Sequence, residues 1–133
     1  MPEQASQLVK HAEKLTTIFG EWPTFHDAEI CAARLDRHDL SLELDIFVFK
    51  TSRTTDASGH LERHTKTLVT FRFHEVEELL FEGFNHQNVL AALTLCRIEK
   101  IEVVLEGIFG LSGRFLCSEA EICRVAPYGQ SGH

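Results

Sequence analysis

The sequence predicts an α+β domain in which one N-terminal helix packs on a sheet of six or seven mainly antiparallel strands. The 133 residues suffice for a single domain over 1–133, and 44% of them are apolar, as in ordinary globular proteins. A helical period occurs once, near the N-terminus. The segments after it alternate between apolar and polar residues and follow one another without intervening helices, which favours antiparallel pairing over a parallel α/β sheet.

The expected helix covers residues 3–19. Its apolar residues recur at spacings of four, three and four residues: Leu8, Ala12, Leu15 and Phe19. Gly20 suits the position just after a helix, because glycine readily adopts the left-handed conformation that ends many helices. We therefore expect one continuous helix whose apolar face packs on the sheet.

Alternation then predicts three strands, over residues 28–36, 40–50 and 65–73. The second strand has the clearest pattern, with one dry and one wet face. Residues 37–39 are expected to form a hairpin turn. Residues 51–63 contain few side chains to bury, so we expect a long mobile loop there.

The second half of the chain predicts four more strands, over residues 77–82, 91–98, 101–106 and 114–125. Residues 84–89 are too polar for a strand and predict a turn, and a tight hairpin is expected around Glu99 and Lys100. Residues 107–113 resemble a glycine-punctuated loop. We expect the last strand to bend near Ser118 and residues 126–133 to form a flexible tail.

Charge and hydropathy exclude several classes of protein. The formal net charge of −7 argues against a nucleic-acid-binding surface, which needs clustered lysine and arginine. No apolar run reaches the length of a signal-peptide core or a membrane span, so we expect a cytoplasmic protein. The four cysteines form no close ligand pair, which predicts reduced, buried, apolar side chains rather than a zinc site.

Four residues are the best candidates for chemistry: His26, Asp27, Glu29 and His86. Two histidines and two carboxylates could serve a small metal-dependent hydrolase or a ligand-binding domain. Neighbours in extended chain point to opposite sides, however, so His26 and Asp27 are expected to diverge. The alternative is structural: both side chains bond nearby backbone and fix the turn into the first strand. A third interpretation is that the motif contacts a partner or ligand, and the residues alone leave all three open.

Acidic residues are concentrated in one part of the chain. Residues 74–106 contain seven acids and only two bases, Arg97 and Lys100, whereas residues 50–72 contain five bases and two acids. A solvated sheet face is one explanation. The other is an acidic patch that attracts a cationic partner.

Four segments match the motifs of one family in order. The first is WPTFHDAE at residues 22–29, followed by an alternating strand. The others are HTKTLVTF at 64–71, FNHQNVL at 84–90 and FGLSGR at 109–114. With these motifs the chain resembles, over about residues 15–125, the immunity protein 50 family of bacterial polymorphic toxin systems.

The resemblance implies a protein that binds a cognate toxin domain and neutralises it, so we expect no catalysis and no cofactor. We also expect no bound metal ion, because His26 and Asp27 should diverge and the sequence has no close cysteine or histidine pairs. Family members meet different toxins, so the motif residues are expected to act on stability: Trp22, Pro23, Phe25, His26, Asp27, Glu29, Asn85, His86 and Asn88. Partner contacts are expected from exposed charge: Glu75, Glu77, Glu78, Glu82, Glu102 and Glu106. The toxin and the oligomeric state are not predicted.

Overall fold

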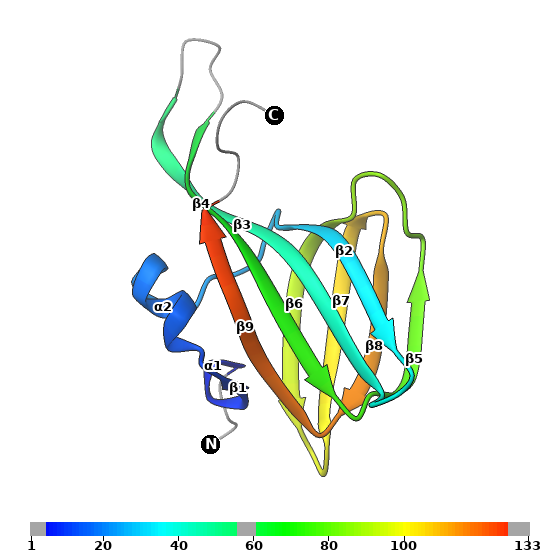
Figure 1. Cartoon of the computed structure of the whole chain (residues 1–133). Coiled ribbons are helices and arrows are strands. Elements are labelled where there is room, and N and C mark those ends of the chain that lie inside the picture. Colours follow the sequence, from blue (N-terminus) through cyan, green and yellow to red (C-terminus); the bar gives the residue numbers. More distant parts are fainter. Residues whose placement is uncertain (1–4, 56–60, 128–133) are drawn as a thin grey trace.

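The computed structural model describes residues 5–55 and 61–127, and the side chains of 5–51 and 64–127. Within these residues, nine strands form a sheet in the order β1-β9-β4-β3-β2-β6-β7-β8-β5 (Figure 1). The elements are α1 (Ala5–Leu8), β1 (Val9–Lys10), α2 (Glu13–Phe19), β2 (Glu29–Asp36), β3 (Ser41–Thr55), β4 (Leu61–His74), β5 (Glu77–Glu82), β6 (Val89–Arg97), β7 (Ile101–Phe109), β8 (Ser112–Cys117) and β9 (Glu119–Pro127).

The predicted α+β class fits broadly, but two of its details are wrong. The described sheet has nine strands rather than six or seven. It is also mixed, because β1 pairs with β9 in parallel through Val9 with Ala120 and Lys10 with Glu121. The other pairings are antiparallel, in keeping with the short connections between successive strands.

The sheet folds over on itself, so the core lies between two half-sheets. The first half-sheet contains β9, β4, β3 and β2, and the second contains β6, β7, β8 and β5. Glu29 of β2 and Val89 of β6 form the register pair that joins them. Figure 1 shows the first half-sheet in front of the second. Phe73 of β4 and Phe115 of β8 are not on neighbouring strands, yet their ring centroids are 4.9 Å apart.

Alternation along the strands supplies this core. In β3, Leu42, Leu44 and Ile46 are fully buried between the half-sheets, whereas Glu43 and Asp45 lie on the outer face. In β7 the buried residues are Ile101, Val103 and Leu105. Burying one such side chain stabilises the fold by about 1.5–3 kcal/mol relative to leaving it exposed.

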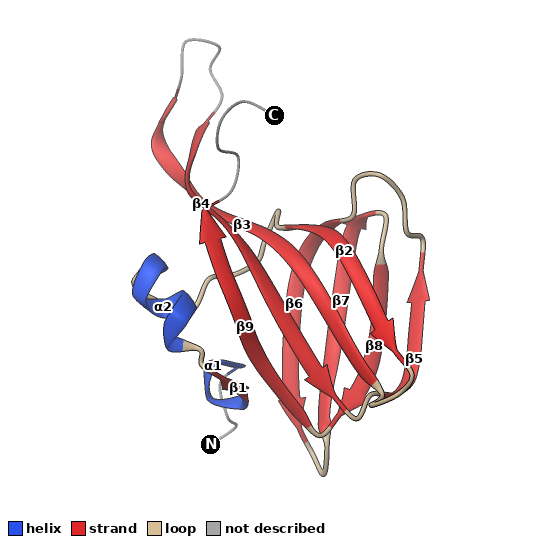
Figure 2. Cartoon of the chain, viewed as in Figure 1, coloured by secondary structure: helices blue, strands red, loops and turns tan. Residues whose placement is uncertain are grey.

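The helix predicted over residues 3–19 is interrupted. α1 ends at Leu8, β1 pairs with β9, and His11 has a left-handed φ of 64° before α2 begins. The predicted apolar stripe still contacts the core: Leu8, Leu15 and Phe19 are buried, and Ala12 is partly buried. The helices lie beside β9 and cover neither outer face (Figure 2). No helix in the described part is long and apolar enough to cross a membrane.

Several predicted boundaries are confirmed. α2 ends at Gly20, whose φ is 81° and whose N–H donates to the Thr16 carbonyl at 2.7 Å. β5 spans Glu77–Glu82 as predicted, and β6 and β7 form a hairpin around residues 98–100. The predicted bend at Ser118 is sharp enough to separate β8 from β9, so the chain passes there from the second half-sheet to the first.

Two predicted loops are shorter than expected. β3 continues to Thr55 and β4 begins at Leu61, so strands occupy much of the predicted loop 51–63, whose residues 56–60 lie outside the described chain. The glycine loop 107–113 is a tight connection between β7 and β8. Gly107 and Gly113 are strand residues with close backbone neighbours. A Cβ on Gly107 would lie 2.4 Å from the Leu111 carbonyl oxygen, and a Cβ on Gly113 would lie 2.3 Å from the Leu80 carbonyl oxygen.

The first two residues of the predicted tail, 126–133, belong to strand β9. Ala126 and Pro127 pair with Leu68 and Thr67 of β4, whereas residues 128–133 lie outside the described chain. Of the four cysteines, Cys117 is buried as predicted, and burial raises the pKa of its thiol to about 11. The others are more accessible than predicted: Cys31 and Cys96 are exposed and Cys123 is half-buried.

Candidate functional site

The first motif, residues 22–29, forms a tight turn that leads into β2. Phe25 and Asp27 both have left-handed backbone conformations, with φ of 63° and 69°. Such conformations are costly for residues other than glycine, so other contacts must maintain them. The Asp27 N–H donates to the Leu90 carbonyl at 2.8 Å, and the Ala28 N–H donates to that of Phe25 at 3.0 Å.

Aromatic packing anchors this turn in the core. The Phe25 ring is buried and lies 5.6 Å from Trp22 and 5.8 Å from Phe71 of β4, measured between ring centroids. Trp22 also meets Phe71 edge-on at 6.2 Å. Aromatic pairs at these distances and angles contribute about 0.5–1.5 kcal/mol beyond area burial. Trp22 and Phe25 therefore attach the turn to the first half-sheet.

His26 and Asp27 do not diverge, contrary to the prediction. His26 Nδ1 lies 3.3 Å from Asp27 Oδ2, because the backbone turns here instead of extending. The two side chains are 62% and 50% exposed. The backbone N–H of His26, rather than its ring, bonds the Thr24 hydroxyl at 3.2 Å. An exposed pair of this kind contributes little to stability.

We expect His26→Ala to change the free energy of unfolding by less than about 0.5 kcal/mol, as is usual for exposed residues. Urea denaturation of the variant and the parent protein measures this difference. A loss above about 1.5 kcal/mol would show that His26 has a structural role that its exposed ion pair does not explain.

The four candidate chemical residues do not converge. Among the described residues, one group of three potential ligands has its donor atoms within 4.8 Å of one another, and it consists of His74, Glu119 and Glu121. The structure therefore does not bring His26, Asp27, Glu29 and His86 together as a metal site, although His26 and Asp27 contact each other as a pair.

The segment FNHQNVL, at residues 84–90, contains the side chain that bonds to nearby backbone. We predicted this role for His26 and Asp27. Asn88 is buried, and its Oδ1 accepts from the N–H groups of Asn85 at 2.8 Å and Leu111 at 3.1 Å. Its Nδ2 donates to the carbonyls of Asn85 at 2.7 Å and Ile30 at 3.4 Å. One side chain thus links β2, the β5–β6 turn and the β7–β8 turn.

Glycine completes this junction, which we define as Ile30, Asn85, Asn88, Gly110 and Leu111. Gly110 has φ of 82°, and a Cβ there would lie 2.5 Å from Asn85 Oδ1 and 2.6 Å from Asn88 Oδ1. Segments that resemble the family at residues 22–29, 84–90 and 109–114 therefore meet where the half-sheets join. The sequence identified these segments but contained no signal for their contact, because the contact is long-range.

We expect Asn88→Ala to destabilise the protein by about 2–4 kcal/mol. The substitution leaves the buried backbone donor of Leu111 and the part-buried donor of Asn85 without an acceptor, and the loss at a buried donor costs about 1–3 kcal/mol. Alanine also tolerates the φ of 47° at this position less well than asparagine. Gln87→Ala, in the same turn but exposed, is the matched control and should change stability by less than about 0.5 kcal/mol in urea denaturation. Equal effects of the two would contradict the account of the junction.

Charges on the outer face of the first half-sheet pair with one another. Arg34 donates two hydrogen bonds to Asp45, at 2.7 and 2.8 Å, and one to Glu43 at 3.1 Å. Arg72 donates to Asp39 at 2.8 Å and lies 3.6 Å from Glu43. Hydrogen bonds from Arg34, opposed by burial, keep the pKa of the Asp45 carboxyl below its usual range. The stability this carboxylate provides is therefore present at neutral pH and is lost as pH falls through the lowered pKa.

The outer face of the second half-sheet is different. Glu102 and Glu106 alternate with the buried residues of β7. Leu116 of β8 pairs with Glu102 of β7 on one side and with Glu77 of β5 on the other. Five of the six glutamates predicted to contact a partner lie on this face: Glu77, Glu78, Glu82, Glu102 and Glu106. The sixth, Glu75, is exposed in the β4–β5 connection. We call the five residues the acidic face.

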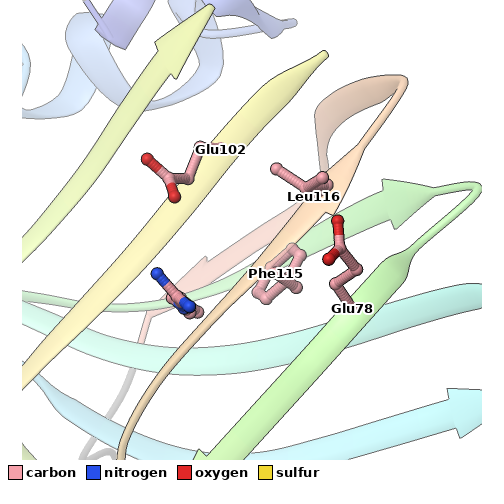
Figure 3. A pocket seen from close by; sticks show the side chains of 5 residues that line it. Glu78, Glu102, Phe115 and Leu116 are labelled. Carbon is pink, nitrogen blue, oxygen red and sulfur yellow. The ribbon is translucent and has the colours of Figure 1, made fainter.

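Most glutamates of the acidic face form no ion pair in the described chain, although the basic residue Arg114 lies among them. Glu77 pairs with Lys100. Within the described chain, Glu78, Glu82, Glu102 and Glu106 form no ion pair. Glu78 of β5 and Glu102 of β7 stand on either side of Leu116, around a shallow cavity of about 220 Å³ that Arg114 and Phe115 also line (Figure 3). Unpaired glutamates on one face create a negative potential there.

Comparison with known proteins identifies the family. A family model described as Immunity protein 50 matches residues 11–128, which include the turn, the junction and the acidic face. The searches of curated proteins and of solved structures gave no match. The resemblance inferred from the motifs is therefore confirmed, and because the match covers most of the sequence, the chain belongs to the Immunity protein 50 family.

Proposed function

We propose that the protein binds a cognate toxin domain stoichiometrically in the bacterial cytoplasm and neutralises it, and that the acidic face contributes to the contact. Family membership supports a toxin as the partner in general. The observation that carries the proposal for the surface is the contrast between the half-sheets: one pairs its charges internally, and the other leaves four glutamates without partners in the described chain.

Electrostatics suggests the chemistry of this partner. Unpaired carboxylates repel one another, so a cationic surface gains energy by approaching them. Complementary charge raises the association rate and excludes partners of the same sign, more than it raises affinity. The apolar side chains between the glutamates, Leu80, Val104 and Leu116, can be desolvated at low cost. We therefore propose a toxin surface with basic residues around an apolar centre.

We further propose that the protein acts without catalysis, because His26, Asp27, Glu29 and His86 do not form one cluster in the described chain. The group that does converge is already engaged in internal contacts. His74 Nε2 lies 2.5 Å from Glu121 Oε2, and Lys10 Nζ lies 2.9 Å from Glu119 Oε1. The ion pair with Lys10 also lowers the pKa of Glu119. These contacts join β1, β4 and β9, which is a structural role.

Co-expression tests the proposal. We expect this protein to restore growth of cells that express the toxin domain encoded beside its gene, and not of cells that express an unrelated toxin domain. Stoichiometric inhibition predicts that rescue depends on the ratio of the two proteins. Failure to protect against the neighbouring toxin, at expression levels that exceed the toxin, would contradict the proposed function.

A further inference from the structure

The sheet is open between β2 and β5. β5 pairs with β8 on one side, and residues 32–36 of β2 pair with β3 on one side. In the part of the chain that the structure describes, no strand pairs with the other edge of either segment. Figure 1 shows β2 and β5 on the same side of the molecule, opposite the helices. Edge strands of this kind present unpaired backbone N–H and C=O groups.

Two cavities lie along this opening and have residues of both edges in their walls. One, of about 260 Å³, is lined by Leu35, Leu40 and Leu79 among others. The other, of about 370 Å³, is lined by Ala33, Phe81, Phe84 and Leu111 among others. We call them together the β2–β5 groove.

The groove is apolar and accessible. Leu35 is 63% exposed, Leu40 is 54% exposed and Phe84 is 65% exposed. Contiguous exposed apolar side chains mark interaction sites more often than isolated ones do. One end is bounded by a hydrogen bond from the Val76 N–H to the Leu40 carbonyl, at 2.8 Å. The other end is bounded by the junction, where Asn88 bonds Ile30.

The two edges differ in their readiness to accept another strand. β5 has a register shift between Glu77 and Leu80, and Glu78 has a left-handed φ of 51°. Bulges and irregular backbone of this kind protect an edge against pairing. β2 instead keeps a regular register with β3 from Ala32 to Asp36, with no bulge in that range. The edge of β2 is therefore the better template.

Charge around the groove selects the occupant. Asp36, Glu77 and Glu78 line one cavity and Glu82 lines the other, whereas Arg37 is the one basic residue in either lining. Three of these four acids also belong to the acidic face, so the groove and that face form one continuous surface. An occupant must combine apolar side chains with positive charge.

We propose that an extended segment of the toxin partner pairs with residues 32–36 of β2 by β-augmentation. Its alternate apolar side chains enter the β2–β5 groove, and its lysine or arginine side chains lie near Glu78 and Glu82. Backbone hydrogen bonds would supply affinity, and the groove would supply specificity, as in other cases of strand addition. This inference rests on the proposed function and specifies the partner's contact.

The experiment compares Leu35→Asp with Ile98→Asp. Both replace an exposed aliphatic residue by the same charged residue, but Ile98 lies in the β6–β7 turn, outside the groove. The probe is the purified toxin domain encoded beside the gene. Melting temperatures establish that both variants are folded. Hydrogen exchange of the unmodified protein, with and without toxin, gives a second measurement that needs no variant.

We expect Leu35→Asp to weaken toxin binding on the order of 30-fold or more, the loss typical of an interface hot spot, and Ile98→Asp to change it less than about threefold. Amides within residues 32–36 should exchange more slowly in the complex. Equal affinities for the two variants, with unchanged exchange at 32–36, overturn the inference but leave the proposed function intact. Absence of toxin binding by the unmodified protein overturns both. The free protein could also prove to be a dimer that Leu35→Asp converts to a monomer without changing toxin affinity. In that case the groove binds a second copy of the chain, and the inference is overturned.

Discussion

Replacing Phe25 by alanine is expected to lower the free energy of unfolding by about 3–5 kcal/mol, as for other buried aromatic residues. The ring is 2% exposed and contacts both Trp22 and Phe71. Removing it leaves a cavity where the turn meets the core, while the left-handed backbone at this position remains costly. Because whole domains are stable by about 5–15 kcal/mol, the variant should melt at a much lower temperature.

Phe109→Ala is the control for this substitution. Phe109 lies at the end of β7 and is exposed, so the same change in side chain should cost less than about 1 kcal/mol. Urea denaturation with fitted midpoint and slope separates a loss of stability from a change in the unfolded state. A Phe25→Ala variant as stable as Phe109→Ala would contradict the assignment of the first motif to stability.

Reversing charge on the acidic face is expected to weaken toxin binding about 100-fold at low salt. The variant combines Glu78→Lys with Glu102→Lys, which lie on either side of the shallow cavity on the outer face. Peripheral charges mainly alter the association rate and its salt dependence, whereas removal of a central desolvated carboxylate costs about 2–5 kcal/mol. Binding kinetics at two salt concentrations therefore distinguish a peripheral from a central position for these residues.

The control variant has the same net charge as the double reversal of Glu78 and Glu102, because it also replaces two glutamates by lysines. Glu13→Lys combined with Glu21→Lys changes two exposed residues in and just after α2, away from the acidic face. We expect this variant to bind within about threefold of the unmodified protein, because screening limits charge effects to about 8 Å at physiological ionic strength. Similar losses in both double variants would mean that net charge, rather than the acidic face, governs binding.

Local patterns predicted much of the fold. The turn predicted at residues 37–39, the strand Glu77–Glu82 and the end of α2 before Gly20 follow from alternation and from turn residues, which act over a few positions. The glutamates of β7 also follow, because Glu102 and Glu106 alternate with buried residues. Alternation alone could not predict that these glutamates share a face with Glu77 and Glu82, because that depends on the pairing of β8 with both β5 and β7.

The remaining features depend on distant contacts. Residues 3–19 have a helical period, but pairing of Val9 and Lys10 with β9 overrides it. Gly107 and Gly113 are typical of a loop, yet they lie in strands where neighbouring backbone leaves no room for a Cβ. The role of Asn88 could not be predicted either, because its partners Ile30 and Leu111 are distant in sequence.

The most direct test of the central claim measures melting temperature and toxin affinity together. The variants are Phe25→Ala, His26→Ala, Asp27→Asn and the double reversal of Glu78 and Glu102. Asparagine is chosen at residue 27 because it tolerates the left-handed φ of 69° there better than alanine. We predict that Phe25→Ala lowers the melting temperature, that the reversal weakens binding in a protein that melts normally, and that His26→Ala and Asp27→Asn change neither strongly. Unchanged affinity of the reversal at low salt, together with loss of binding by a normally melting His26 or Asp27 variant, would place the toxin interface on the first motif instead of the acidic face.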